Sequence, residues 1–282
     1  MLPFEDMPTS SQHELGPGLT AFRMEDAGQA VELVPARGGL VTRWTVGGEE
    51  VLYLDEATLL DPSKNVRGGI PQLFPSPGKP GAGSPLPQHG FARQRPWTPA
   101  PAAGAALACE LASDAATLAV FPHPFRLRFR AALEGGSLQL TWTVTNPGPA
   151  PLPLHLGIHP YFRVPAAQKA RSRLEHSAAR AFDNLLGREV PVAPVDLAGP
   201  EVDLHLTAQA LPTAVLHRGA GRALRLSWTP EFKVLVLWTQ PGKDFVCVEP
   251  WTARGGALGS GEGLLHVAPG AAAALGIALR LE

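Results

Sequence analysis

Two adjacent segments of strictly alternating residues limit the fold of this chain more than any other feature. In FRLRF, residues 125–129, phenylalanine or leucine alternates with arginine, and SLQLTWTVTN at 137–146 alternates apolar with polar residues. Successive side chains of a β-strand point to opposite faces, so each segment has one face for a core and one for solvent. The intervening EGGS predicts a hairpin that joins the two strands.

Similar strand-like runs recur along the whole chain. They are AVELV at 30–34, LVTRWTV at 40–46, TLAVF at 117–121, VDLHL at 202–206, ALRLSW at 223–228, KVLVLW at 233–238, FVCVE at 245–249 and AAAALGIALRLE at 271–282. Helical periodicity is scarce, and only EATLLDP at 56–62 predicts a short helical turn. The 30 glycines and 30 prolines are typical of abundant turns. These patterns predict an all-β protein, a large antiparallel β-sandwich or barrel. We expect residues 1–18 to form a loosely ordered arm and residues 19–282 to form a single domain.

Composition excludes several classes of partner. The formal net charge of −1 over 282 residues gives no electrostatic reason to expect nucleic acid or an anionic membrane. No apolar run reaches the length of a membrane span, and MLPFEDMPTS does not resemble a signal peptide. The two cysteines, Cys109 and Cys247, have no zinc-binding spacing and predict no disulfide scaffold. We therefore expect a soluble cytoplasmic protein, either a monomer or a weak homodimer.

Two of four candidate motifs combine arginine with residues that constrain the backbone. In NVRGGIPQLFP, residues 65–75, Arg67 precedes two glycines, so the chain either approaches a ligand or forms a surface turn with a solvated arginine. In PLPQHGFARQRPW, residues 85–97, His89 lies between proline and glycine, where a rigid backbone would hold its imidazole firmly. Arg93 could bind a hydroxyl, a carboxylate or a phosphate through its planar guanidinium.

The third motif, LHLGIHPYF at 154–162, contains two histidines. On a regular strand His155 and His159 would share a face, and Pro160 would end the hydrogen-bonded ladder. Two imidazoles with a carboxylate from elsewhere would form a metal site, but no acidic residue lies nearby in the sequence.

The fourth motif, DFVCVEPWT at 244–252, places Phe245, Cys247 and Glu249 on one face of a strand that Pro250 is expected to end. Burial would raise the pKa of the Glu249 carboxyl and make it a better general base near neutral pH. The alternative is an exposed glutamate at a strand end. Cys247 is expected to pack as a small apolar residue.

Together the four motifs, in this order, resemble those of the aldose 1-epimerase family of galactose mutarotase-like proteins. The resemblance rests on RGGIP, HGFAR, HPYF and VEPW, which span residues 67–251. It implies a large antiparallel β-sandwich and the interconversion of α and β anomers of an aldose, without cofactor or metal. PLPQHGFAR is similar to the branch that acts on hexose 6-phosphates, whereas PGKDFVCVEPWT is similar to a bacterial branch of broader aldose epimerases.

The resemblance also implies roles for individual residues. Glu249 matches the general base, His159 matches the general acid that protonates the ring oxygen, and His89 matches a second histidine on the ring-oxygen side. The substrate-binding candidates are Arg67, Arg93, Asp203 in EVDLH, Gln88 and Trp251, with Phe74 as a second aromatic candidate. Arg67, Arg93 and Lys79 could together bind a phosphate, or Arg93 could brace its loop through an internal ion pair.

Two rival functions remain open at this point. A non-catalytic carbohydrate-binding β-sandwich would use the same pocket without needing an acid and a base. A metal-dependent sugar isomerase on a cupin-like barrel would use His89, His155, His159 and Glu249 as ligands. All three readings have a small sugar or sugar phosphate as the partner.

Overall fold

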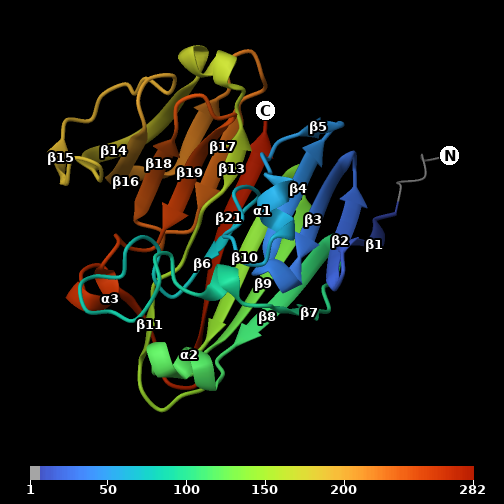
Figure 1. Ribbon diagram of the computed structural model, residues 1–282, viewed down its shortest axis with the longest axis vertical. Helices are drawn as coiled ribbons and strands as arrows, with labels where there is room; N and C mark the ends of the chain where they lie inside the picture. Colours follow the sequence, from blue (N-terminus) through green and yellow to red (C-terminus); the bar gives the residue numbers. More distant parts are fainter. Residues whose placement is uncertain (1–6) are drawn as a thin grey trace.

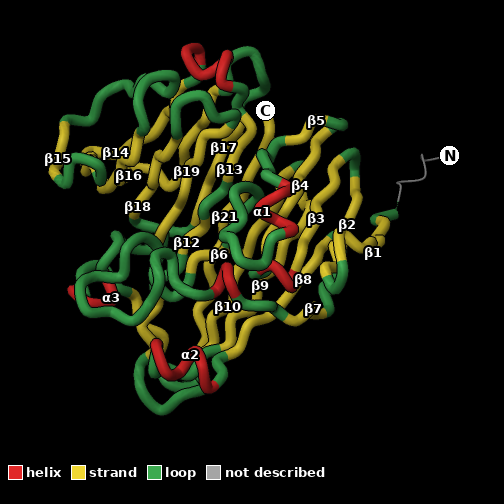
Figure 2. The backbone as a smooth tube through the Cα atoms, viewed as in Figure 1, coloured by secondary structure: helices red, strands yellow, loops and turns green. Residues whose placement is uncertain are grey.

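The computed structural model describes residues 7–282 of the chain. Most of these residues lie in antiparallel strands, and the few helices are short (Figure 2). The predicted all-β, antiparallel architecture is confirmed. Among the described residues no helix is long and apolar enough to cross a membrane.

Two sheets form the body of the protein. The smaller has five strands in the order β1 (Thr9–Gly16), β2 (Leu19–Asp26), β3 (Gln29–Val34), β4 (Leu40–Val46) and β5 (Glu49–Glu50). The main path of the larger sheet runs β6 (Gln72–Leu73), β12 (Gly157–Ile158), β19 (Phe245–Trp251), β18 (Val234–Thr239), β16 (Val202–His217), β17 (Leu224–Trp228), β21 (Ala272–Leu281), β10 (Ser137–Thr145), β9 (Arg126–Glu134), β8 (Ala106–Ala112) and β7 (Thr98–Ala100). In Figure 1 the blue strands of the smaller sheet lie beside the green strands of the larger one, and contacts join β2 to β8 and β3 to β9.

The remaining elements border these sheets. Strand β13 (Tyr161–Arg163) pairs with β19, β14 (Arg173–Asp183) pairs with β16 and with β15 (Arg188–Val190), and β11 (Leu152–Leu154) pairs with β20 (Leu265–Val267). The α-helices are α1 (Glu56–Leu60), α2 (Ala115–Val120) and α3 (Ala257–Ser260), and the 3-10 helices are η1 (Pro35–Arg37), η2 (Ala92–Gln94) and η3 (Ala166–Arg171). The short helical turn predicted at 56–62 is α1.

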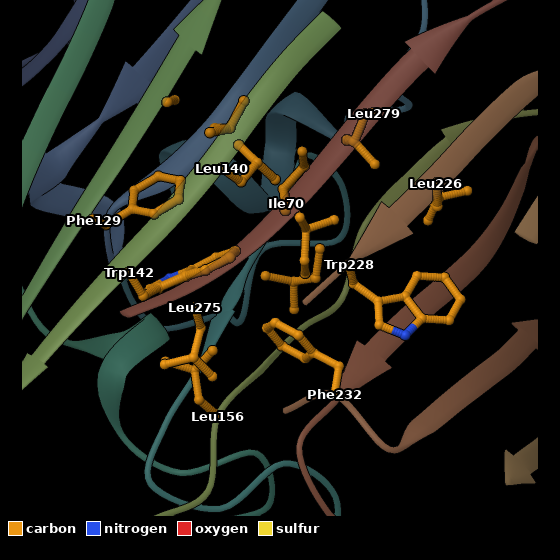
Figure 3. Close-up of a cluster of buried hydrophobic side chains, with 14 of the residues drawn as sticks. Ile70, Phe129, Leu140, Trp142, Leu156, Leu226, Trp228, Phe232, Leu275 and Leu279 are labelled. Atoms are coloured by element: carbon orange, nitrogen blue, oxygen red, sulfur yellow. The ribbon is translucent and has the colours of Figure 1, made fainter. Parts of the chain in front are cut away.

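The hairpin predicted from alternation is β9–β10, and it carries much of the core. Trp142 of β10 is 1% exposed and stacks on Phe129 of β9, with 5.3 Å between ring centroids. Figure 3 shows both rings in the core with Phe232 and Leu275. The Trp142 indole donates a hydrogen bond to the buried side chain of Gln72 in β6, at 2.8 Å. The hairpin therefore anchors the strand that follows the RGGIP motif.

The segment TLAVF at 117–121 was expected to be a strand, and this prediction is wrong. Its residues belong mainly to helix α2, because Asp114 caps the helix. The Asp114 carboxylate accepts a hydrogen bond from the Thr117 backbone N–H at 2.7 Å, and the Thr117 hydroxyl accepts one from the Asp114 N–H at 2.8 Å. This reciprocal capping box satisfies N–H groups that a helix otherwise leaves unpaired.

The first residues of the described chain also differ from expectation. Residues 1–6 of the arm expected at 1–18 lie outside the described residues, whereas Thr9–Gly16 form β1 and pair with β2 over most of their length. Most side chains of β1 are exposed, so no apolar alternation marked it as a strand. The single domain expected for 19–282 stays a prediction.

Candidate active site

A cavity of about 850 Å³ lies where β16, β18 and β19 run side by side. It contains eight of the residues that the sequence nominated as catalytic or substrate-binding. They are Arg67, Gln88, His89, Arg93, His159, Asp203, Glu249 and Trp251, and Lys79 lines the same cavity. Segments nearly 200 residues apart in sequence thus converge on one space.

Glu249 lies deep in this cavity on strand β19 and is 1% exposed. The predicted alternation is confirmed, since Val246 and Val248 belong to the main core while Phe245 and Cys247 form a separate cluster on the other side. The expectation that Glu249 is buried is confirmed, and the alternative of an exposed strand end is excluded.

Pro250 does not end the strand, contrary to expectation. β19 continues to Trp251, and Pro250 pairs with Leu235 of β18. On its other side β19 pairs with Gly157 at Trp251 and with Tyr161 at Cys247. Between these two contacts the neighbouring chain turns away from the ladder, so a residue without an N–H is tolerated at position 250.

His159 occupies the interruption between β12 and β13, next to Pro160. Its Nδ1 lies 3.3 Å from Oε1 of Glu249. The imidazole stacks on Tyr161 at 4.7 Å between centroids and meets the edge of Trp238 at 5.4 Å. Within residues 7–282, neither His159 Nδ1 nor Glu249 Oε2 has a hydrogen-bond partner. The two groups are buried, adjacent and free to bond with a ligand.

Burial shifts the pKa values of this pair in opposite directions. It raises the pKa of Glu249 well above its usual range, and the nearby Asp203 charge adds to the effect. Burial and the Arg93 charge lower the pKa of His159 to about 3. These opposite shifts favour the neutral form of both groups, a protonated carboxyl and a neutral imidazole.

His89 is held in a single tautomer by the backbone. The Gly78 N–H donates a hydrogen bond to His89 Nδ1 at 3.1 Å, so the ring proton resides on Nε2. Burial, together with the charges of His159 and Arg93, lowers the pKa of His89 to about 2. The imidazole is thus a neutral hydrogen-bond donor whose ring lies 5.5 Å from that of His159.

Arg93, at the centre of η2, uses only part of its guanidinium for hydrogen bonds within its own loop. Its guanidinium donates one hydrogen bond to the Gln88 carbonyl at 3.1 Å, and its buried Nε has no partner among the described residues. No carboxylate in residues 7–282 forms an ion pair with it, so the proposed brace through an internal ion pair is not found. Burial lowers the pKa of Arg93, opposed by the nearby Tyr161 and Glu249.

Two further cations lie at the exposed margin of the cavity. The side chains of Arg67 and Lys79 are exposed, and both residues line the cavity from loops. Arg67 Nη1 donates a hydrogen bond of 3.4 Å to the side chain of Gln240. The cavity thus combines the buried pair Glu249 and His159 with a cationic mouth, formed by Arg67 and Lys79 at its exposed margin.

Asp203 faces the cavity from β16 and is oriented by two neighbours. Asn184 Nδ2 donates a hydrogen bond to its carboxylate at 2.7 Å, and His205 Nε2 lies 3.4 Å away. Burial raises the pKa of Asp203, but the hydrogen bonds from His205 and Asn184 outweigh burial and leave it below its usual value. Trp251 meets His205 edge-on, at 5.3 Å between ring centroids.

Sequence reasoning missed several residues that line the cavity. They are Tyr161, Asn184, Glu201, His205 and Trp238. The alternation in VDLHL places His205 on the same strand face as Asp203, so this residue could have been found. Nothing in the sequence near Asn184 or Glu201 indicates a site, because strand pairing alone brings them to the cavity.

Two candidates do not belong to the site. Phe74 is fully buried in an aromatic cluster with Phe91 and Phe125, so it offers no face to a sugar. His155 is also fully buried, because β11 ends and β12 begins around it, and its Nε2 lies 3.0 Å from the Ala253 carbonyl. The predicted shared face for His155 and His159 is therefore wrong.

The metal-isomerase reading requires His89, His155, His159 and Glu249 as ligands. Since His155 does not line the cavity, these four residues do not come together. A different trio, His159, Cys247 and Glu249, has donor atoms within 4.8 Å of one another. Burial and the nearby Glu249 raise the pKa of the Cys247 thiol well above its usual range, so it stays protonated at neutral pH. Cys247 packs as a small apolar residue, as expected.

His155 gives a pH dependence of stability that is separate from the active site. Burial lowers its pKa to about 4, against 6.5 in the unfolded chain. The unfolded state therefore binds more protons between these values, and His155 lowers the free energy of unfolding as the pH falls below 6.5. We expect the loss of stability between pH 7 and pH 5 to be about 2 kcal/mol smaller in His155→Gln. Urea denaturation at both pH values measures it, and an unchanged difference would contradict the lowered pKa.

Comparisons with known proteins find relatives over most of the chain. The model of the aldose 1-epimerase family matches residues 21–258. A protein of Cenchrus ciliaris named "Putative glucose-6-phosphate 1-epimerase" is 31% identical over 251 residues, covering 76% of this chain and 72% of the relative. The crystal structure of the Slr1438 protein from Synechocystis sp. PCC 6803 is 35% identical, with a TM-score of 0.87, and covers 100% of this chain and 99% of that chain. A galactose mutarotase-like protein from Clostridium acetobutylicum is 17% identical with a TM-score of 0.81, covers 98% and 99% of the two chains, and shares the fold.

Proposed function

Because this chain belongs to the aldose 1-epimerase family and is an isomerase of aldose anomers, we propose that its preferred substrate is a hexose 6-phosphate. The family assignment confirms the predicted mutarotase-like β-sandwich and favours catalysis over the binding-module and metal-isomerase readings. The observation that carries the substrate proposal is the cationic mouth of the cavity. The exposed Arg67 and Lys79 line this mouth, and Arg93 lines the same cavity with a buried Nε that has no partner among the described residues.

In the proposed mechanism, Glu249 and His159 move two protons at the anomeric centre. Glu249 removes the proton of the C1 hydroxyl while His159 donates a proton to the ring oxygen, and the bond between C1 and the ring oxygen breaks. The open-chain aldehyde rotates about C1–C2. The ring then closes on the other face of the carbonyl, with each group returning to its starting state.

Opposite pKa shifts prepare the pair for this exchange. Burial favours a protonated Glu249 and a neutral His159. The reactive arrangement has an ionised Glu249 and a protonated His159, and it differs only by transfer of one proton across the 3.3 Å contact. In this proposal a bound sugar favours that form, because its hydroxyl donates to the carboxylate and its ring oxygen accepts from the imidazolium.

The remaining cavity residues would orient the sugar. His89 would donate its Nε2 proton on the ring-oxygen side, since its Nδ1 is occupied by the Gly78 N–H. Asp203 and Gln88 are suited to sugar hydroxyls, and Trp251 offers an apolar surface. A 6-phosphate would lie at the mouth near Arg67 and Arg93, where charge-assisted hydrogen bonds are strong.

Anomer exchange measured by NMR tests the substrate proposal. We expect the enzyme to accelerate exchange of glucose 6-phosphate more than that of glucose or galactose at equal concentration. In Arg67→Ala, kcat/KM for glucose 6-phosphate should fall by about 10- to 100-fold, the loss expected for hydrogen bonds to a charged group. Activity on glucose should change little.

Arg95→Ala provides a matched control, because Arg95 pairs with Asp114 and does not line the cavity. Equal losses on glucose and glucose 6-phosphate in Arg67→Ala would make Arg67 a ligand of sugar hydroxyls. Acceleration of free sugars alone by the wild-type enzyme would overturn the phosphate proposal.

A further inference from the structure

Lys169 is a buried cation outside the cavity that the mechanism does not use. It lies in η3 and is 1% exposed. Its ammonium donates hydrogen bonds to the Thr239 hydroxyl at 2.6 Å and to the Gln240 carbonyl at 2.8 Å. Within residues 7–282 it forms no ion pair with a carboxylate, although burying an ammonium without a counter-charge is costly. The role of Lys169 therefore follows from its hydrogen bonds to Thr239 and Gln240.

Those bonds fix the corner between β18 and β19, the turn that begins after Thr239 and ends at Phe245. Thr239 is the last residue of β18, and its hydroxyl donates to the Phe245 carbonyl at the start of β19 at 2.8 Å. The Lys169 ammonium also lies 5.7 Å from the centroid of the Phe245 ring. Lys169 thus ties η3 to the ends of two strands that line the cavity, and it holds the main chain of Gln240 directly.

From this corner the side chain of Gln240 reaches the cavity mouth. Its Oε1 accepts the hydrogen bond from Arg67 at 3.4 Å, and its Nε2 donates to Glu201 at 3.4 Å. Glu201 in turn accepts a hydrogen bond from the indole of Trp238 at 2.9 Å. The two 3.4 Å contacts of the Gln240 side chain are long and weak, so they depend on accurate placement of the Gln240 backbone.

We propose that Lys169 is a positioning residue for substrate recognition, because it fixes the Gln240 backbone and thereby holds Arg67 at the cavity mouth. The proposal rests on the proposed function only in that Arg67 binds the substrate. It does not depend on whether Arg67 contacts a phosphate or a hydroxyl. It assigns Lys169 to binding of the substrate and leaves the proton transfers to Glu249 and His159.

Kinetics of Lys169→Met test this assignment, since methionine retains most of the buried volume without the ammonium. We expect KM for glucose 6-phosphate to rise about 10-fold, within the range of coupling between residues of one hydrogen-bond network, while kcat changes less than 2-fold. Lys243→Met is the matched control, because it removes an exposed lysine from the neighbouring loop and should leave both constants unchanged. A loss confined to kcat would overturn the assignment.

A double-mutant cycle with Arg67→Ala separates positioning from general damage to the fold. If Lys169 acts through Arg67, Lys169→Met should raise KM less than 2-fold in the Arg67→Ala background. A full 10-fold increase in that background would overturn the proposal. Gln240→Ala, which keeps Lys169 and removes only the bridging side chain, should reproduce the KM effect even if Lys169→Met fails to fold.

The cycle also distinguishes this proposal from the choice of substrate. If the wild-type enzyme accelerates glucose and not glucose 6-phosphate, the phosphate proposal fails, and the same cycle is measured on glucose. Coupling between Lys169 and Arg67 on glucose would then still support the positioning role. Independent effects of the two substitutions on whichever sugar reacts would refute it.

Discussion

Replacing Glu249 by glutamine is expected to lower kcat for anomer exchange by about 10³-fold, within the range for loss of a general base. Glutamine has the same shape but cannot accept the proton of the anomeric hydroxyl. KM should change little, because the amide can still hydrogen-bond a sugar and the cavity keeps its form. NMR exchange spectroscopy, corrected for the spontaneous reaction, measures both constants.

Glu134→Gln is the control for this substitution, since Glu134 lies exposed at the end of β9, away from the cavity. It should behave as the wild type. If Glu249→Gln kept more than a tenth of the wild-type kcat, Glu249 could not be the base. A large rise in KM with unchanged kcat would instead assign Glu249 to sugar binding.

Replacing Gly90 by alanine is expected to lower the free energy of unfolding by about 3 kcal/mol and to abolish most activity. Gly90 has φ of +68°, and a Cβ there would lie 2.2 Å from the Phe74 carbonyl oxygen and 2.7 Å from the Pro75 nitrogen. These are backbone atoms, which cannot rotate away as a side chain would. The adjacent His89 would be displaced with the loop.

Gly104→Ala isolates the contribution of the contact. Gly104 has a similar φ of +73°, but a Cβ there would meet nothing within 4 Å. Alanine at this position should cost only about 1 kcal/mol, from the unfavourable backbone conformation. Thermal and urea denaturation of both variants give the comparison. Equal losses would mean that the approach of Gly90 to Phe74 has no energetic consequence.

Strand structure was predictable where one face of a strand is buried and the other is solvated. The β9–β10 hairpin follows directly from this alternation. The burial of Glu249 follows instead from the apolar residues around it, since every residue of β19 is buried. Helix α2 was mistaken for a strand because TLAV at 117–120 is short and mostly apolar without a clear period, and the decisive capping residue Asp114 precedes it. Local capping chemistry overrode the apolar pattern.

Convergence of the four motifs on one cavity did not follow from any local pattern. It was expected only from the resemblance to a known family, because the distance between Arg67 and Glu249 depends on how β6, β12 and β19 pair. The same reason explains the errors at Phe74 and His155. Each lies close in sequence to a residue that lines the cavity, but a break or turn in the strand directs it into the core.

Depth divides the cavity into two parts that evolution can alter separately. Glu249 is fixed on a strand whose every residue is buried, so a substitution nearby would disturb the core as well as the chemistry. Arg67 and Lys79 belong to loops and are exposed, where substitutions are tolerated far more easily. A descendant of this protein could therefore exchange its loop residues and accept a different sugar while it inherited the reaction unchanged.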